Sequence, residues 1–196
     1  TTLATNLASY CAVAGQRVAL ADFDPQGSSL TWLGARGSGR PPIRGIAAFR
    51  EPFRPARDTE VVIIDPPAAV HGQELTSLLK RAETIIIPVL PSPIDMRAVA
   101  GFIEEVRNST PIAARKARIA LVANRTREHT NIYRELEEFL GGLKVPVLSH
   151  LRDSMNYIRA AERGVGIFEM GPCETAVDRA QWLPILKWLA SSKSRP

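Results

Sequence analysis

The sequence predicts an α/β protein with a doubly wound, mostly parallel sheet and helices on both faces. Its apolar runs are continuous and rich in β-branched residues, as in strands that are buried on both faces. Stretches with the apolar spacing of helices separate these runs, so strands and helices alternate along the chain. A length of 196 residues and an apolar fraction of 45% fit one domain over residues 1–196 with its own core.

Five runs are expected to be strands, and most of them end in residues that favour a turn. They cover residues 18–21, 61–64, 84–89, 118–123 and, as a weaker fifth, 145–148. The first two are followed by Asp22 and Asp65. Because ligands of open α/β sheets bind at the carboxyl ends of the strands, these acidic turns are the first candidates for a site.

Five segments with apolar residues three and four positions apart are expected to be helices, namely 2–14, 95–108, 130–140, 154–163 and 173–190. Glycines follow the first and the third of them, where a helix commonly ends. The segment 34–58 is rich in Gly, Pro and Arg and has little periodicity, so it is expected to be a surface excursion.

Composition excludes several classes of protein. No apolar stretch approaches 18 residues, so a membrane-spanning helix is not expected. Cys11 and Cys173 form no CxxC pair, which speaks against a zinc or iron–sulfur framework and favours a reduced, cytoplasmic chain. The net charge of +5 suits a polyanionic partner without requiring one.

Two carboxylates at the ends of successive buried strands suggest chemistry. Asp24 and Asp65 could hold a magnesium ion through waters and orient an attacking water. A single strand-end aspartate more often caps a turn, but two of them, followed by Pro-Gln-Gly and Pro-Pro, favour a site. Thr1 and Thr2 open the first helix, where their hydroxyls either cap the helix or bind a phosphate or a metal.

Taken together, these segments resemble the ParA/MinD family of deviant Walker ATPases, most closely the small bacterial partitioning ParA proteins. TTLATNLA resembles the residues after the Walker A lysine, ADFDPQGSS the second motif, and VVIIDPPAA the Walker B strand. The later segments TIIIPVLPSPIDMRAV, LVANR and SHLRDSMNYIRAAERGVGIFEM resemble later parts of those proteins. The resemblance runs from Thr1 to about Trp188.

The resemblance implies an ATPase that uses ATP and Mg²⁺. It implies that the Thr1 hydroxyl lies on the magnesium ion, that Thr2 contacts a phosphate and that Asp65 holds the ion through water. Phosphoryl transfer agrees with such a set, because it needs positioning, a metal and charge neutralisation more than covalent chemistry.

The resemblance also implies a catalytic pair and a base-side residue. Asp24 would orient or activate the attacking water, Asp22 would support the turn that carries it, and Asn124 would sit near the adenine edge. The family's first strand and Gly-Gly-x-Gly-Lys loop precede the residue that matches Thr1, and the sequence as given starts after them. We therefore expect this chain by itself to bind ATP weakly or not at all. Pro66 replaces the small polar residue that usually follows the Walker B aspartate.

Partners follow from the same resemblance. It implies an ATP-dependent homodimer, nonspecific DNA, a ParB-like protein that stimulates hydrolysis, and a cytoplasmic, nucleoid-associated location. The matching basic residues are Arg152, Arg159 and Arg163, of which the last two are four apart and share a helix face. A solvated basic face is the alternative for these three residues.

The predicted function is therefore a partitioning or positioning ATPase whose cargo is a plasmid, a chromosome region or a large protein assembly. One alternative is a MinD-like membrane-cycling ATPase. The last predicted helix favours packing on the core over membrane binding, because it has apolar residues at helical spacing, namely Trp182, Ile185, Leu186 and Leu189. A second alternative is a non-hydrolysing DNA-binding or scaffold protein on the same fold. A metabolic enzyme such as a synthetase would need a substrate pocket that the sequence does not reveal.

Overall fold

A computed structural model describes residues 1–68, 70–114 and 116–196 of the chain. The chain divides into two compact units, each of which combines two stretches of sequence. Unit 1 comprises Thr1–Val70 and Met155–Arg179, and unit 2 comprises His71–Ser154 and Ala180–Pro196. Among the described residues, no helix is both long enough and apolar enough to cross a membrane.

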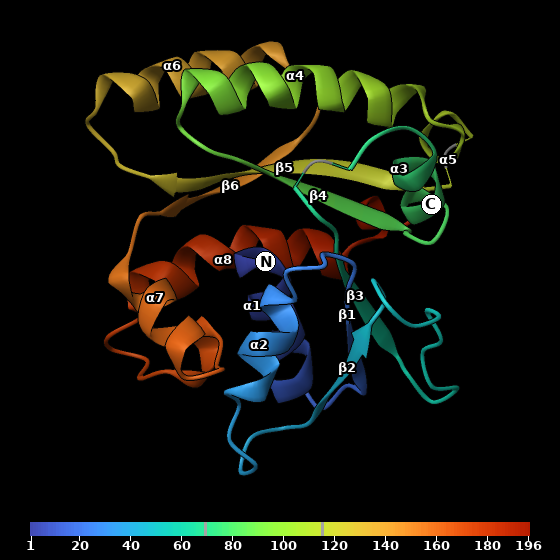
Figure 1. Cartoon of the computed structure of the whole chain (residues 1–196). Helices are drawn as coiled ribbons and strands as arrows, with labels where there is room; N and C mark the ends of the chain where they lie inside the picture. The colour runs from blue at the N-terminus through green and yellow to red at the C-terminus, as the bar shows by residue number, and fades with distance from the viewer. Residues whose placement is uncertain (69, 115) are drawn as a thin grey trace. The chain divides into compact units, whose positions relative to one another are not determined.

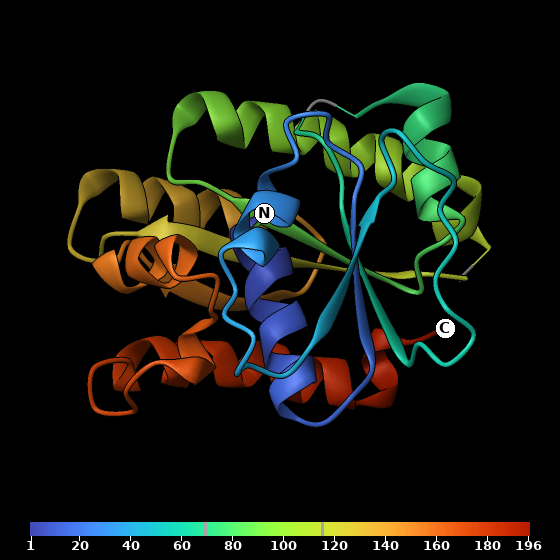
Figure 2. The same ribbon diagram turned by 60° about the horizontal axis from the view of Figure 1, so that its bottom comes forward.

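Unit 1 is built on a three-stranded parallel sheet in the order β2-β1-β3 (Figure 1). The strands are β1 (Val18–Asp22), β2 (Ile43–Ala47) and β3 (Val61–Asp65). The helices are α1 (Thr2–Val13), α2 (Ser28–Gly34), α7 (Met155–Glu162), the 3-10 turn η1 (Ile167–Glu169) and the start of α8 (Ala176–Ala190). Figure 2 shows α1 running along β1.

Small residues bring α1 close to this sheet. Ala4, Ala8 and Ala12 recur at intervals of four and form one buried stripe of the helix. This stripe packs with Leu20 of β1 and Trp32 of α2 in one hydrophobic cluster. The alternate residues of β1 pack elsewhere, in a second cluster of Ala19, Ala21 and Ile46 together with Phe23, Ala48 and Phe53. Strand β1 is therefore buried on both faces, as its continuous apolar run predicts, whereas Val62 of β3 is exposed.

Unit 2 has its own three-stranded parallel sheet in the order β4-β5-β6. The strands are β4 (Thr84–Val89), β5 (Arg118–Thr126) and β6 (Val147–Arg152). The helices are α3 (Gly72–Leu79), α4 (Pro93–Asn108), α5 (Thr110–Ala113), α6 (Asn131–Gly142), the remainder of α8 and the 3-10 turn η2 (Ser192–Ser194).

Helices cover both faces of the sheet in unit 2. In Figure 1, α4 and α6 lie side by side over one face, where Ile103 of α4 and Leu136 of α6 join the core of the strands. On the other face, residues 180–190 of α8 lie along the sheet, and the Ser149 hydroxyl of β6 donates to the Gln181 carbonyl. Trp182 is fully buried there.

The α/β class with parallel strands and helices is confirmed, and each of the ten expected elements is present, with the strands paired in two three-stranded sheets. The expectation for residues 34–58 is partly wrong, because β2 forms inside this segment and buries Ile43 and Ile46. The strand has only five residues, and Arg44 and Gly45 at its middle are exposed, so it has no continuous apolar run. The short helices α2, α3 and α5 were also not expected from the pattern.

Candidate nucleotide site

The carboxyl edge of the sheet in unit 1 gathers three of the predicted carboxylates. Asp22 and Asp65 end β1 and β3, stand opposite each other in the register and are both buried. The pairing continues one residue further, because the Phe23 amide donates to the Asp65 carbonyl at 2.9 Å. Asp24 follows on the same turn and is half-buried. Parallel pairing thus places these side chains at one edge of the sheet.

Asp22 organises the turn between β1 and α2. Its Oδ1 accepts a hydrogen bond from the Asp24 amide at 3.0 Å. Its Oδ2 accepts from the amides of Ser29 and Leu30 at 3.1 and 3.2 Å, in the first turn of α2, where backbone amides have no partner within the helix. With both oxygens engaged by backbone amides, Asp22 is suited to hold this turn in place.

Asp24 is differently placed. Its Oδ1 accepts from the Gln26 amide at 2.9 Å, and its carbonyl accepts from the Gly27 amide. Within the described part of the chain its Oδ2 has no hydrogen-bond donor. Gly27 has φ of +63°, which explains the glycine of the Asp-Pro-Gln-Gly turn. The turn therefore presents a half-buried carboxylate with one free oxygen.

The start of α1 lies at the same edge. The backbone nitrogen of Thr1 is 3.1 Å from Asp65 Oδ1. Thr1 is the N-cap residue, yet its hydroxyl makes no capping hydrogen bond, so the capping alternative is not observed for it. A cavity of about 370 Å³ borders Thr1 and Thr2 together with residues of α2 and α7. A helix start with free hydroxyls is chemically suited to a phosphate.

The oxygen atoms at this edge fit a magnesium ion that is shared with a phosphate ligand. Mg²⁺ prefers oxygen ligands, keeps several waters and commonly takes only one or two protein groups. The Thr1 hydroxyl and the Asp65 carboxylate are groups of this kind. No cluster of three or more His, Cys, Asp or Glu side chains able to hold a metal occurs among the described residues. A metal here would therefore depend on the nucleotide for further ligands.

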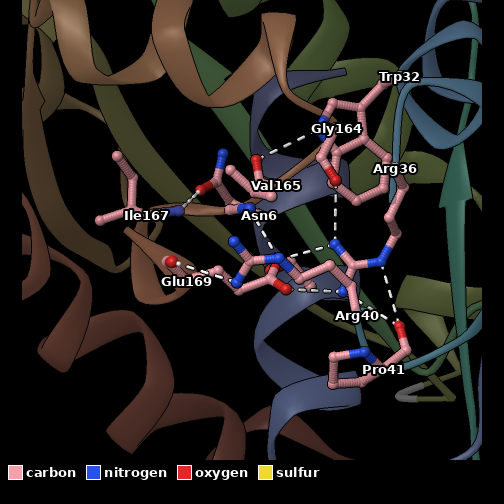
Figure 3. Close-up of polar contacts among 11 residues, drawn as sticks. Asn6, Trp32, Arg36, Arg40, Pro41, Gly164, Val165, Ile167 and Glu169 are labelled. Atoms are coloured by element: carbon pink, nitrogen blue, oxygen red, sulfur yellow. Dashed lines mark hydrogen bonds and ion pairs between the residues drawn. The ribbon is translucent and has the colours of Figure 1, made fainter. Parts of the chain in front are cut away.

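A buried ion pair that the sequence did not predict joins Arg36, which follows α2, to Glu169 of η1, beside Ser9 of α1 (Figure 3). The Arg36 guanidinium makes two parallel bonds to the Glu169 carboxylate, at 2.7 and 2.8 Å, with side chains that are only 4% and 2% exposed. Glu169 also accepts from the Ser9 hydroxyl of α1 and the Gly166 amide. Burial by itself raises the pKa of Glu169, but these hydrogen bonds and the arginine charge hold that pKa below its ordinary value.

Asn6 links the first turn of α1 to the same region. Its Nδ2 donates to the Thr2 carbonyl and its Oδ1 accepts from the Ile167 amide, both at 2.8 Å. The end of α1 that carries Thr1 and Thr2 is thus held by η1, which follows it by more than 150 residues. No sequence signal points to these contacts, because pattern reasoning covers only neighbouring residues.

The remaining predicted residues lie on other elements. Asn124 is half-buried on β5 of unit 2, one residue before Arg125, whose φ is +54°. Arg152 ends β6 in unit 2, whereas Arg159 lies on α7 of unit 1 and Arg163 directly follows that helix. Arg159 forms an exposed ion pair with Glu174 at 3.0 Å, and Arg163 is exposed. Exposed pairs of this kind contribute little to stability, about 0–1 kcal/mol, and are readily exchanged.

Comparisons with known proteins agree with this geometry. The family model of the CobQ/CobB/MinD/ParA nucleotide binding domain matches residues 1–167. The maintenance of carboxysome distribution protein A of Halothiobacillus neapolitanus is 30% identical over 182 residues, which cover 87% of this chain and 82% of that protein.

Solved structures share the fold at low sequence identity. A plasmid partition protein of Borrelia burgdorferi bound to AMPPNP has a TM-score of 0.69 at 14% identity, over 95% of this chain and 92% of that one. The septum site-determining protein MinD of Pyrococcus horikoshii, complexed with Mg-ADP, has a TM-score of 0.63 at 14% identity, over 100% and 93%. The chain belongs to the CobQ/CobB/MinD/ParA family of nucleotide-binding domains and has the P-loop-type α/β fold of the ParA and MinD positioning ATPases.

Proposed function

We propose that this chain belongs to the ATPase of a positioning system, and that the full protein binds ATP with Mg²⁺ at the carboxyl edge of the sheet in unit 1. The observation that carries the proposal is the meeting of Asp22, Asp65 and the start of α1 at that edge. The Halothiobacillus relative is named for carboxysome distribution, which favours a large protein assembly as the cargo. A plasmid or a chromosome region is the alternative cargo.

In this proposal each residue has one task. Thr1 and Asp65 hold Mg²⁺, Asp65 through water, and Thr2 contacts a phosphate. Asp24 accepts a proton from the attacking water or orients it, which its free Oδ2 permits. Asp22 keeps Asp24 in place through the amide bonds of the turn. Asn124 contacts the adenine edge. The metal neutralises charge on the phosphates when it is bound.

In the cycle that we propose, ATP binding and hydrolysis control whether the protein is bound to DNA. ATP promotes a homodimer, and the dimer binds DNA nonspecifically through Arg152, Arg159 and Arg163. A ParB-like partner protein then stimulates hydrolysis, and the dimer releases DNA. In this scheme the protein is cytoplasmic and associates with the nucleoid. Slow hydrolysis without the partner suits a switch, since each turnover ends one period of binding.

Replacing the proposed catalytic carboxylate tests this function. In the full protein, Asp24→Asn is expected to lower ATP hydrolysis about 100-fold, because the group that orients the water is lost. Nucleotide binding, measured by calorimetry, should stay within a few-fold of the unsubstituted protein. Asp58→Asn is the matched control, since Asp58 is exposed and lies beside Arg17 instead of this edge. Unchanged hydrolysis by the Asp24→Asn protein would contradict the assignment.

Two other functions give different results in simple assays. A MinD-like membrane cycle requires sedimentation with anionic liposomes that is lost when residues 180–196 are removed. The burial of Trp182 and Ile185 in α8 argues against it, because these apolar side chains are already covered. A non-hydrolysing scaffold requires that the full protein never releases phosphate, with or without DNA.

A further inference from the structure

Positive charge is concentrated in one segment of unit 1. The unit as a whole has as many acidic as basic side chains, yet residues 36–57 contain six arginines, no lysine and one carboxylate, Glu51. Arg36 is buried and paired with Glu169. Arg40 is exposed, but its guanidinium donates to the Glu169 carbonyl at 3.4 Å, in the region of η1. The remaining four side chains are exposed, and we name them the arginine strip: Arg44, Arg50, Arg54 and Arg57.

The arginine strip is not neutralised by nearby acids. None of its four members pairs with a carboxylate anywhere in the described ranges. Glu51 accepts a hydrogen bond from the Ala47 amide at 2.9 Å. Asp58 and Glu60, which follow the strip, lie beside Arg17 at 3.8 and 3.3 Å. The strip therefore presents several positive charges without a carboxylate partner.

The loop that carries most of the strip is held in place by packing of an aromatic side chain on the core of unit 1. Figures 1 and 2 show residues 48–60 as an irregular loop from β2 to β3, on the side of the strands away from α1 and α2. Phe53 of this loop packs against Phe23, with ring centroids 5.6 Å apart, and joins the core cluster of Ala19 and Ile46. Anchoring of this kind lowers the entropic cost of binding, because the backbone is ordered before the ligand arrives.

We propose that the arginine strip binds the phosphate backbone of duplex DNA, at a surface separate from the arginines of α7. The inference rests on the proposed function, because it assumes that the protein binds DNA. It adds a second DNA-contacting surface to the one formed by Arg152, Arg159 and Arg163. A strip made wholly of arginine favours phosphate, because the guanidinium group binds two phosphate oxygens at once. Sequence-independent DNA binding needs just such an array of positive charges.

Other polyanionic partners fit the strip less well. Among the described residues, the large apolar side chains that are exposed all lie outside residues 36–58, so the strip has no group to insert into a lipid surface. Phe49 and Phe53 are half-buried instead of exposed. Protein interfaces are centred on buried aromatic or apolar anchors, which the exposed face of the strip also lacks.

The test measures DNA affinity in the absence of nucleotide, where the ATP-dependent dimer does not contribute. Binding of a short labelled DNA duplex to the full protein is measured by fluorescence anisotropy over a range of salt concentrations. Arg44→Gln with Arg57→Gln is expected to weaken binding about tenfold and to reduce the slope of log affinity against log salt by about two, one for each lost phosphate contact.

Two further double variants, which remove the same charge elsewhere, test whether the loss of DNA affinity is specific to the strip. Arg97→Gln with Arg107→Gln removes the same charge from the exposed face of α4 and should leave affinity within about twofold. Arg159→Gln with Arg163→Gln should lower binding in the presence of ATP but keep the nucleotide-free affinity. Each variant is checked by its melting temperature, and exposed arginines should leave it unchanged.

The outcomes separate the strip from the proposed function. DNA affinity of the strip variant equal to that of the unsubstituted protein would overturn the inference while ATP-dependent binding through α7 could persist. Loss of binding to a poly-glutamate peptide or to anionic vesicles, without loss of DNA affinity, would assign the strip to another partner and overturn it too. Strip-dependent DNA binding in a protein that never hydrolyses ATP would support the strip and reject the proposed function.

Discussion

At the scale of single residues, aspartates and glutamates of unit 1 act through backbone amides as much as through other side chains. Asp22 accepts three amide hydrogen bonds and thereby positions Asp24. Glu169 accepts one amide, one hydroxyl and a bidentate arginine. Both side chains are buried, where an unpaired charge is costly, so each depends on its complete set of partners.

Glu169→Gln is therefore expected to lower the free energy of unfolding by about 3 kcal/mol, because it leaves the buried Arg36 guanidinium without a counter-charge. Urea denaturation near neutral pH measures this change. Glu104→Gln on the exposed face of α4 is the control and should be nearly neutral. A change below about 1 kcal/mol would mean that the pair contributes little beyond its hydrogen bonds.

The same residue gives stability a dependence on pH with a definite sign. The pKa of Glu169 is lower in the folded chain than its ordinary value of 4.5. Its contribution is therefore complete above the ordinary value and is lost as the pH falls through the lowered folded value. The stability difference between the unsubstituted protein and Glu169→Gln should accordingly shrink below about pH 4.5.

At the scale of elements, the start of α1 is held by segments distant in sequence. The loop that leads from α7 to η1 passes so close to the end of α2 that glycine is required in it. Gly164 has φ of +61°, and a Cβ there would lie 2.3 Å from the Arg36 nitrogen and 2.6 Å from the Ala35 carbonyl carbon. The position of η1, which binds Asn6 and Ser9 of α1, depends on this close approach.

Gly164→Ala is expected to destabilise the protein by about 2 kcal/mol or more, since the methyl group meets backbone atoms and the left-handed conformation is strained for alanine. Thermal or urea unfolding measures the loss. Gly37→Ala in the same unit is the control, because nothing lies within 4 Å of its added Cβ and its φ is not positive. Equal stability of the two variants would show that the loop rearranges to accept the added methyl group without loss of stability.

At the scale of the whole molecule, ligand binding and folding are linked by mass action. A nucleotide that binds only the folded chain raises its stability by an amount set by its concentration relative to the dissociation constant, about 2.7 kcal/mol at a hundredfold excess. In the proposed site Thr1 and Asp65 would hold a Mg²⁺ ion that neutralises charge on the phosphates, so the gain should depend on Mg²⁺.

The melting temperature of the full protein should therefore rise with ATP and Mg²⁺ and return toward its ligand-free value when EDTA is added. Asp65→Asn is expected to remove most of the Mg²⁺-dependent part of the increase, because one carboxylate charge near the metal is lost. Differential scanning fluorimetry measures both effects. A full response to ATP in EDTA would show that binding does not use a metal.

Much of the fold could be predicted, because its signals are local. Continuous apolar runs predicted β1, β3, β4 and β5 closely, and helical spacing predicted α1 and α4. The short edge strand β2 was missed, since a five-residue strand with an exposed middle has no pattern that distinguishes it from a loop. Strand-end positions predicted that Asp24 and Asp65 would lie at one edge, and the parallel register places Asp22, two residues before Asp24, opposite Asp65.

The sequence by itself determined the class of fold, the order of the main elements and the family, since periodicity and the Asp-Pro-Gln-Gly and Walker B segments are written in neighbouring residues. Only the tertiary structure decided which arginine of the 36–57 segment is buried and which five face outward. It also paired Arg36 with Glu169 across 133 positions. Such contacts are set by packing between elements, and no local pattern carries them.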